Sequence, residues 1–251
     1  MFGTEKYPLR CSALPDLVKC PMKAKLQYDE FYSGGSSASA DTGTAVHYGI
    51  ELFHQRKEVQ EATRMMENAL PESFPKADLE EAVKQFQAYA EDPRNQVEVP
   101  WLEVKIKFIL PPHRTDPTGL PIHITGKLDQ IRRENGELYL WDVKTGAYES
   151  GGQMLNSYAV QLAAYAYGAS KCLGTHVKVG GIIATKDYRR KTQGPVFWEV
   201  PWKGENHGKV LMSTVAKRVA EIRSGEALPH PGSLCNFCSF GLSSCLGRIE
   251  V

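Results

Sequence analysis

The chain has 251 residues, of which 42% are hydrophobic and 24% are charged, the balance of an ordinary globular protein with a sizeable core. Thirty lysines and arginines against 29 aspartates and glutamates leave a net charge of +1, so any binding of nucleic acid needs a local basic patch. The N-terminus lacks the basic start and apolar run of a signal peptide, and no run of about 18 apolar residues predicts a membrane span. These features predict a cytoplasmic protein without membrane contact.

The periodicity of apolar residues predicts helices at both ends of the chain and strands between them. Spacings of three and four predict helices over residues 13–29, 45–55, 59–70 and 76–91, with the Gly- and Ser-rich stretch 32–43 as a loop. Alternation then predicts three strands from Val97 onward, in WLEVKIKFIL, IHITGKLDQIRR and ELYLWDVKT. A helix over 153–172, strands VKVGGIIAT and PVFWEVPW, and a helix over 205–224 follow. This order predicts an α/β fold, a central mixed β-sheet flanked by helices.

Polar residues at the end of the third strand are the first candidates for chemistry. Asp142 and Lys144 are two positions apart, so their side chains point to the same face of the strand. A hairpin that turns at Asn135-Gly136 brings Asp129 of the preceding strand close to Asp142. Two adjacent carboxylates repel each other unless a cation lies between them.

A divalent cation such as Mg²⁺ or Mn²⁺ would supply that positive charge. Its ligands would be the carboxylates of Asp129 and Asp142 and the carbonyl of Val143, with water and a phosphate in the remaining positions. Lys144 would orient or help to deprotonate a metal-bound water and neutralise charge on the phosphate. An Asp-x-Lys pair alone is a weak signal, because many strands end in polar residues.

The order of these motifs resembles the PD-(D/E)XK nuclease superfamily, in its RecB-like branch. The matching elements are GxxD from Gly126 to Asp129, DVKTG around Lys144, QxxxY on the next helix, and an upstream helical histidine. The resemblance implies a restriction-endonuclease-like core and a Mg²⁺- or Mn²⁺-dependent DNA nuclease, an exonuclease on single-stranded ends. It also implies a site made of these residues: the catalytic Asp129, Asp142, Lys144, Gln161 and Tyr165, and the metal ligands His47, Asp129, Asp142 and Val143.

Two further acids lie near these motifs in the sequence. Glu103 on the first strand could support the metal site, and Glu51, one helical turn after His47, could orient its imidazole. For both residues the sequence favours solvent exposure.

Six cysteines remain, and their spacing indicates a metal centre. Three of them form Cys235-x₂-Cys238-x₆-Cys245 near the C-terminus, and Cys20 precedes a proline. RecB-like nucleases with an iron–sulfur cluster, among them CRISPR-associated exonucleases and AddB-type subunits, carry one cysteine before the nuclease core and three after it. By resemblance these four residues bind a 4Fe-4S cluster that joins the two ends of the chain; zinc is the alternative for four thiolates. Cys11 competes with Cys20, and Cys172 is expected to be a core residue.

A phosphate track is predicted in TKDYRRKTQG, where basic side chains can bind backbone phosphates and an aromatic ring can stack on a base. Its residues are Lys186, Tyr188, Arg189, Arg190 and Lys191. Arg132 and Arg133 are further candidates for contact with DNA.

The chain is expected to form one integrated domain with three parts: a helical region (1–96), the nuclease core (97–228) and a cysteine segment (229–251). Because it has no GxxxxGK[ST] phosphate loop, any unwinding must come from a partner such as a helicase; a recombinase or a CRISPR integrase would be other partners. Two other functions fit parts of the sequence: a catalytically idle DNA-binding or assembly module, and a zinc-stapled RNA-binding protein that leaves the acidic pair unexplained.

Overall fold

The computed structural model spans residues 1–251 and describes all of them except 30–37, 57, 146–150, 187–194, 201–204 and 229–251. The side chains of 28–29, 38–41, 151–157 and 205–207 are also not described. Within the described part of the chain, no helix is both long and apolar enough to cross a membrane.

Most predicted elements are present, and their boundaries lie close to the expected ones. The N-terminal half holds β1 (Leu9–Arg10), η1 (Cys11–Ala13), α1 (Leu14–Lys19), α2 (Pro21–Asp29), α3 (Ala38–His54), α4 (Val59–Ala69), α5 (Lys76–Glu91) and η2 (Pro93–Asn95). The remainder holds β2 (Glu98–Leu110), β3 (Ile122–Glu134), β4 (Glu137–Lys144), α6 (Gly151–Leu173), β5 (Val177–Ala184), β6 (Val196–Glu199) and α7 (Glu205–Arg223).

Three local details differ from the sequence expectation. The helix predicted over 13–29 is divided into α1 and α2, because Cys20 is extended (φ −151°, ψ 96°), as the residue before a proline prefers. Residues 38–43 of the expected loop already belong to α3. The strand β1 was not predicted, since two residues are too few to show any alternation.

The strands form one mixed sheet in the order β1-β3-β4-β5-β6, with β2 paired to β3. The β2–β3, β3–β4 and β5–β6 pairs are antiparallel, and β4–β5 is parallel. The expected tight turn joins β3 to β4, with Asn135 and Gly136 in the left-handed region (φ 51° and 80°). The α/β fold with a mixed sheet between helices is therefore confirmed.

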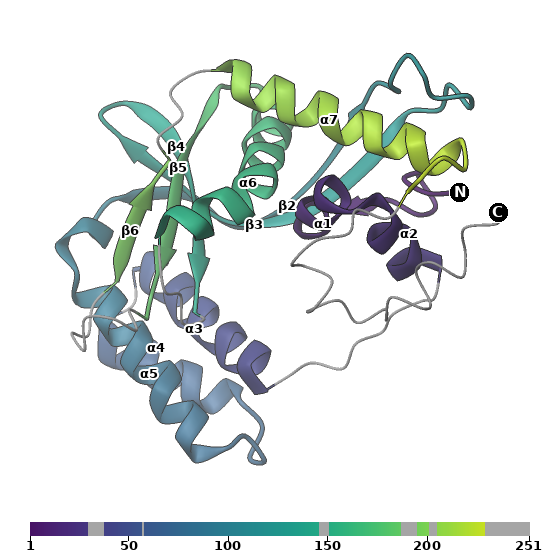
Figure 1. Cartoon of the computed structure of the whole chain (residues 1–251). Helices are drawn as coiled ribbons and strands as arrows, with labels where there is room; N and C mark the ends of the chain where they lie inside the picture. Colours follow the sequence, from purple (N-terminus) through teal and green to yellow (C-terminus); the bar gives the residue numbers. More distant parts are fainter. Residues whose placement is uncertain (30–37, 57, 146–150, 187–194, 201–204, 229–251) are drawn as a thin grey trace.

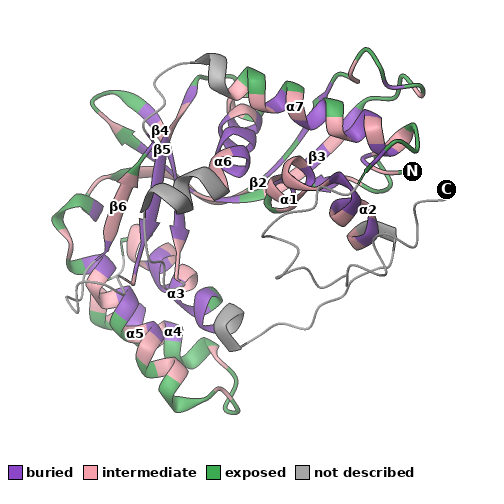
Figure 2. Cartoon of the chain, viewed as in Figure 1, coloured by how far each residue is buried: buried purple, intermediate pink, exposed green. Residues whose placement is uncertain are grey.

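Helices cover both faces of this sheet (Figure 1). One apolar core joins it to α1, α6 and α7, and a second joins β4 and β5 to α3, α4 and α5. The central strands β4 and β5 are largely buried between these layers (Figure 2). The N-terminal helices α3 to α5 thus share a core with the sheet.

The sheet is interrupted beside β3. One edge of β3 pairs with β2 along most of its length. The other edge pairs with β1 at Ile124 and Thr125, and with β4 only from Gln130 onward. Between these two ladders, the backbone from Gly126 to Asp129 has no strand partner on that edge among the described residues. We call this interval the β3 notch; it coincides with the GxxD motif.

At the Asp129 end of the notch, the alternation of side chains shifts by one residue in both β2 and β3. The residues of β2 that pack on the α6 core include Trp101 and then Val104, and those of β3 include Leu128 and then Ile131. Both spacings are three rather than two, so each strand turns an additional side chain to the other face. Glu103 lies at this point of β2 in a left-handed conformation (φ 51°), which costs a non-glycine residue about 1 kcal/mol.

A buried polar cluster joins α3, α5 and β3 behind the notch. The hydroxyl of Tyr89 donates to Gln130 Oε1 (3.1 Å), accepts from Arg132 Nη2 (3.1 Å) and lies 2.8 Å from His54 Nε2. The side chain of Arg132 also bonds to Asn95 and lies over the rings of Trp141 and Phe197. Because burial and the charge of Arg132 oppose protonation, the pKa of His54 falls to about 4.

This low pKa predicts acid sensitivity that begins near neutral pH. Below the pKa of about 6.5 in the unfolded chain, that chain binds a proton that the native His54 rejects until about pH 4. The contribution of His54 to the free energy of unfolding should therefore fall by about 2 kcal/mol between about pH 7 and about pH 5, measured by urea titration at each pH. His54→Gln should remove most of this slope, whereas His113→Gln on the β2–β3 loop should retain it; equal slopes in the two variants would contradict the assignment.

Candidate functional site

The site is built around the carboxylate of Asp129 at the C-terminal end of the β3 notch. The β3–β4 ladder ends at Gln130–Trp141, so Asp129 and Asp142 are the next residues along the two strands, as the hairpin predicted. In place of a backbone carbonyl, Asp129 Oδ2 accepts the N–H of Val143 at 2.6 Å. The opening in the sheet thus holds a carboxylate between two strands.

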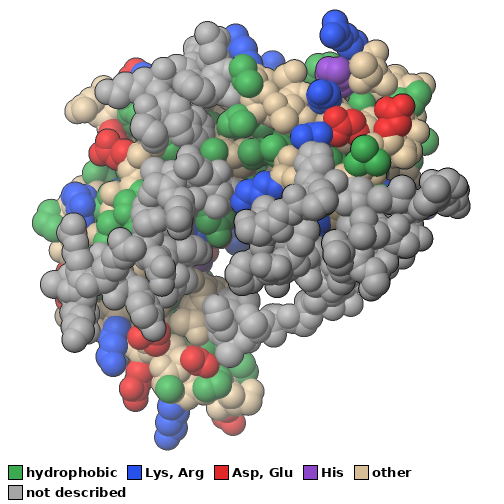
Figure 3. All heavy atoms as spheres, viewed as in Figure 1, with side chains coloured by type: hydrophobic (Ala, Val, Ile, Leu, Met, Phe, Trp, Pro, Cys, Tyr) green, Lys and Arg blue, Asp and Glu red, His purple; other side chains and the backbone are tan. Residues whose placement is uncertain are grey.

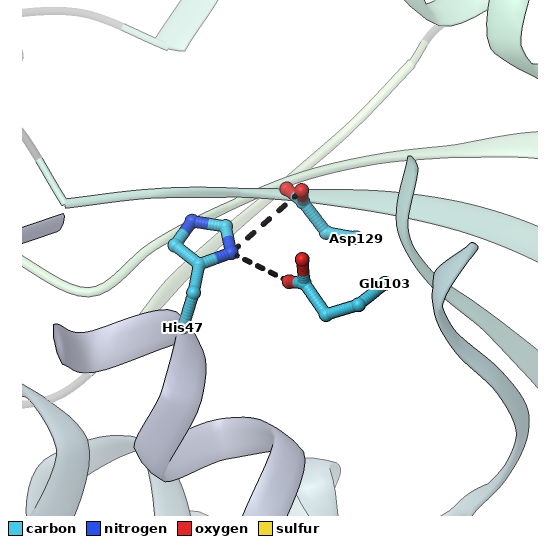
Figure 4. Close-up of side chains that lie close together, drawn as sticks. All are labelled: His47, Glu103 and Asp129. Atoms are coloured by element: carbon cyan, nitrogen blue, oxygen red, sulfur yellow. Dashed lines mark hydrogen bonds and ion pairs between the residues drawn. The ribbon is translucent and has the colours of Figure 1, made fainter. Parts of the chain in front are cut away.

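The side chains of Asp129 and of Glu103 on β2 both point toward His47 of α3 (Figure 4). His47 Nδ1 lies 3.0 Å from Glu103 Oε1 and 3.7 Å from Asp129 Oδ1. Lys127 of β3 pairs with the other oxygen of Glu103. Ligand atoms of His47, Glu103 and Asp129 all lie within 4.8 Å of one another, an arrangement that could hold a metal ion.

The electrostatics of this cluster are those of crowded carboxylates held by cations. Burial raises the pKa of Asp129, and the charges of Asp142 and Glu103 add to the rise. Burial alone would lower the pKa of His47, but the negative charges of Asp129 and Glu103 raise it to about 9. Burial would raise the pKa of Glu103, but its bonds to His47 and Lys127 hold it below the usual range. His47 is therefore a protonated donor to an ionised Glu103 in this form of the protein.

Asp142 and Lys144 share one face of β4, as predicted from their spacing. Lys144 Nζ lies 2.6 Å from Asp142 Oδ2 and 4.8 Å from the ring centre of Tyr158 on α6. The Asp142 side chain is 2% exposed and that of Lys144 is 19% exposed. Burial opposes the charge on Lys144, but Asp142 and Asp129 raise its pKa well above the usual range, so the side chain is a cation beside the carboxylates.

The two other motif elements meet at the opposite end of the notch. A Cβ built on Gly126 would lie 2.7 Å from Tyr165 Cε1 and 2.9 Å from Cys11 Sγ, so the ring of Tyr165 fits there only because residue 126 is glycine. Burial, with the negative charges of Asp142 and Asp129, raises the pKa of Tyr165. Gln161, one helical turn before Tyr165, is also buried. GxxD and QxxxY are thus parts of one packing unit.

The structure corrects one expectation about the acids and leaves another in place. The sequence favoured an exposed Glu103, but its side chain is 13% exposed and bonded to His47. The cause is α3, which packs against this part of β2 and brings His47 to Glu103; no alternation pattern reveals such a contact. The only feature of the sequence that pointed to a role of Glu103 in the site was its position on a strand next to the aspartate of GxxD. Glu51 bonds weakly to Gln55 on the surface of α3 (3.3 Å). The roles of Asp142 and the Val143 carbonyl as metal ligands stay predictions.

The cysteine prediction lies mostly outside the described residues. Cys235, Cys238 and Cys245 are in the segment that the structure does not describe, while Cys20 is free and half-buried. Cys11 is fully buried in the apolar core, and burial raises its pKa to about 12. The expectation for Cys172 was wrong: it is exposed near the end of α6.

The predicted phosphate track is described at one residue only. Lys186 follows β5 and pairs with Glu81 of α5 at 2.8 Å; Tyr188, Arg189, Arg190 and Lys191 lie outside the described residues. Arg132 was wrongly assigned to DNA, because it is 1% exposed and belongs to the buried cluster around Tyr89. Arg133 is exposed and pairs with Glu98.

A mixed sheet that carries paired acids, a lysine at a strand end and a helical histidine defines the class of nucleases with a restriction-endonuclease-like core. The model of the PD-(D/E)XK nuclease superfamily matches residues 9–243, nearly the whole chain. The chain belongs to this superfamily. A search of curated proteins finds no match. Among solved structures, one titled "Crystal structure of SSO0001" is similar over 94% of this chain and 85% of that chain, with 14% identity and a TM-score of 0.47.

The contact between Gly126 and Tyr165 yields a test of the notch. Gly126→Ala should destabilise the protein by about 1–3 kcal/mol, since the added methyl group meets a packed ring; φ at this position is not left-handed. Tyr165→Leu should relieve part of that cost, which a double-mutant cycle of unfolding free energies measures as coupling. As a control, Gly208→Ala on α7 adds a methyl group with nothing within 4 Å and should stabilise by about 0.5–1 kcal/mol. Strict additivity of the 126 and 165 substitutions would refute the contact.

Proposed function

We propose that this nuclease is a Mg²⁺- or Mn²⁺-dependent deoxyribonuclease that shortens single-stranded DNA ends in the cytoplasm. The observation that carries the proposal is the convergence of His47, Glu103 and Asp129 on one side of the sheet opening, with the Asp142–Lys144 pair on the adjoining strand. Phosphodiester cleavage needs a cation to offset charge on the phosphate and a positioned group beside the attacking water.

The donor set fits a divalent cation. Carboxylate oxygens with an imidazole nitrogen suit Mn²⁺, and the oxygens alone suit Mg²⁺. The cross-strand acids Glu103 and Asp129 repel each other, and in the metal-free protein His47 and Lys127 offset that repulsion. We propose that His47, Asp129 and Asp142 hold the metal, with the Val143 carbonyl, and that Glu103 either joins them or orients His47. A bound cation would polarise the phosphate and lower the pKa of its water.

The chain's own cation at this site is Lys144. Its ammonium group, held by Asp142 at 2.6 Å, can donate hydrogen bonds to a phosphate oxygen or to the water that attacks it. Tyr165 and Gln161 are buried on α6, the helix whose Tyr158 ring lies beside Lys144, and we propose that they position Lys144 and the substrate strand.

Lys144→Ala should lower the rate of DNA cleavage by about 10²–10³-fold, because it removes a charge aimed at the reacting phosphate. The assay is digestion of end-labelled single-stranded, duplex and flapped DNA with Mg²⁺ or Mn²⁺, and with EDTA as the metal-free reference. The variant should keep most of its affinity for DNA, since the residue contributes to the reaction rather than to the strand contacts.

Lys178→Ala is a matched control, because Lys178 lies on the neighbouring strand β5 and pairs with Glu137 at the surface. It should cleave DNA like the unmodified protein. Full activity of Lys144→Ala would overturn the assignment of this site. Failure of the unmodified protein to cleave any DNA form or to bind Mn²⁺ would favour the alternative of a catalytically idle DNA-binding module.

For the cysteines we propose the 4Fe-4S cluster, held by Cys20, Cys235, Cys238 and Cys245, with a structural role. The motif spacing and the Cys-Pro context of Cys20 support it, and the burial of Cys11 in the apolar core favours Cys20 as the N-terminal ligand. A helicase, a recombinase or a CRISPR integrase remains the proposed class of partner.

Anaerobically purified protein should be brown and contain about four iron atoms per chain. Cys20→Ser should lose the iron and the visible absorbance, because one of four ligands is removed, whereas Cys172→Ser should keep both. Colourless protein with stoichiometric zinc would replace the cluster by a zinc site.

A further inference from the structure

Beyond Glu103 and Asp129, which contact His47 of α3, the long β2–β3 hairpin presents a face that no helix covers in the described structure. Its even-numbered residues pack into the α6 core; they include Ile106, Phe108, Leu110 and Ile124. Strand alternation places the odd-numbered residues on the opposite face. We call these residues, with Arg10 of β1, the hairpin strip: Arg10, Lys105, Lys107, Ile109, His123, Thr125 and Lys127.

The strip is open to solvent. Lys105, Lys107 and Lys127 are exposed, with side-chain exposures of 57% for Lys107 and 55% for Lys127. Ile109 is 52% exposed, although it is a large apolar residue in a strand. An uncovered face with an apolar side chain among lysines is suited to a ligand that has both charged and apolar parts.

The charges of the strip are poorly balanced within the protein. The ladder places Lys105 directly opposite Lys127, and like charges across a ladder destabilise a sheet. Lys127 pairs with Glu103, and Lys107 pairs loosely with Glu5 at 3.4 Å. Lys105 has no carboxylate partner among the described residues. By contrast, acidic and basic side chains are interspersed over the α4–α5 end of the molecule (Figure 3).

The strip begins at the candidate site. Register aligns Glu103 with Asp129, between the pairs Leu102–Gln130 and Val104–Leu128. The next pair on the same face is Lys105–Lys127. Same-face residues of a strand are about 7 Å apart, so the strip from Glu103 to Ile109 extends for about 20 Å. The spacing of about 7 Å between same-face residues is close to the distance between successive phosphates of an extended nucleic-acid strand.

We propose that the hairpin strip binds the phosphodiester backbone of a single DNA strand and leads that strand into the site of Asp129 and Lys144. Lys105 and Lys107 neutralise successive phosphates, and Ile109, opposite His123, contacts a base at the far end. Lys127 is the residue of the hairpin strip that pairs with Glu103 of the candidate site. The inference rests on the proposed function, because it assumes that the strand being cut enters the site from the hairpin.

The test is the salt dependence of DNA binding by Lys105→Gln/Lys107→Gln. Binding of a labelled single-stranded oligonucleotide of about 20 nucleotides is measured by fluorescence anisotropy without metal, in the Lys144→Ala background. Loss of two phosphate contacts should lower affinity about tenfold at low salt and reduce the slope of log K against log salt by about 1.4. The loss should be much smaller for a dinucleotide, because its single phosphodiester can contact only one of the two lysines.

The matched control is Lys209→Gln/Lys217→Gln, which makes the same charge change at exposed positions of α7. Because α7 packs with α1 and α6 on the other side of the sheet, this pair should not alter affinity or slope. Equal losses in the two double variants, or no loss in either, would overturn the proposal. An equal loss with blunt duplex DNA would overturn its restriction to a single strand.

The outcomes also separate this inference from the proposed function. If the unmodified protein cleaves DNA with Mg²⁺ or Mn²⁺ but substitution of Lys105 and Lys107 leaves DNA affinity unchanged, only the proposal about the hairpin strip is wrong. If binding depends on these lysines but no metal supports cleavage, the strip stands and the nuclease activity fails.

Discussion

The hydrogen bond from the backbone of Val143 to the carboxylate of Asp129 is the interaction on which the site depends. It takes the place of the next backbone bond in the β3–β4 ladder and allows the sheet to open without leaving the Val143 N–H unsatisfied. At the other end of the opening, Gly126 leaves space for Tyr165 and Cys11. The GxxD motif is therefore a structural device as well as a source of a ligand, since its two defined positions are the two ends of the notch.

Charge balance is the second constraint. Four ionisable side chains, Glu103, Asp129, Asp142 and Lys144, meet His47 in a largely buried volume, so each one depends on the state of the others. His47 and Lys144 are held as cations by the acids around them. A divalent ion would relieve the same repulsion more completely. The strained backbone of Glu103 is consistent with a site in which stability is given up to bring carboxylates together.

Much of the fold was readable from local patterns. Strand alternation and the Asn135-Gly136 turn set the register that aligns Asp129 with Asp142, and helical periodicity located α3 to α7. The predictions failed where contacts in the tertiary structure outweighed the local sequence pattern. Arg132 reads as a surface cation, yet four hydrogen-bond partners and two aromatic rings allow its burial. Glu103 reads as one more exposed charge in an alternating strand, yet α3 packs against this part of β2 and brings His47 to it.

The sequence by itself determined the class of fold, the superfamily and the identity of the motif residues, because these follow from spacing along single strands and helices. Only the tertiary structure decided which residues meet. The notch beside β3, the burial of Glu103 against His47 and the uncovered lysines of the hairpin all depend on how separate helices and strands meet. That is a property of several segments at once, and no single segment of the sequence records it.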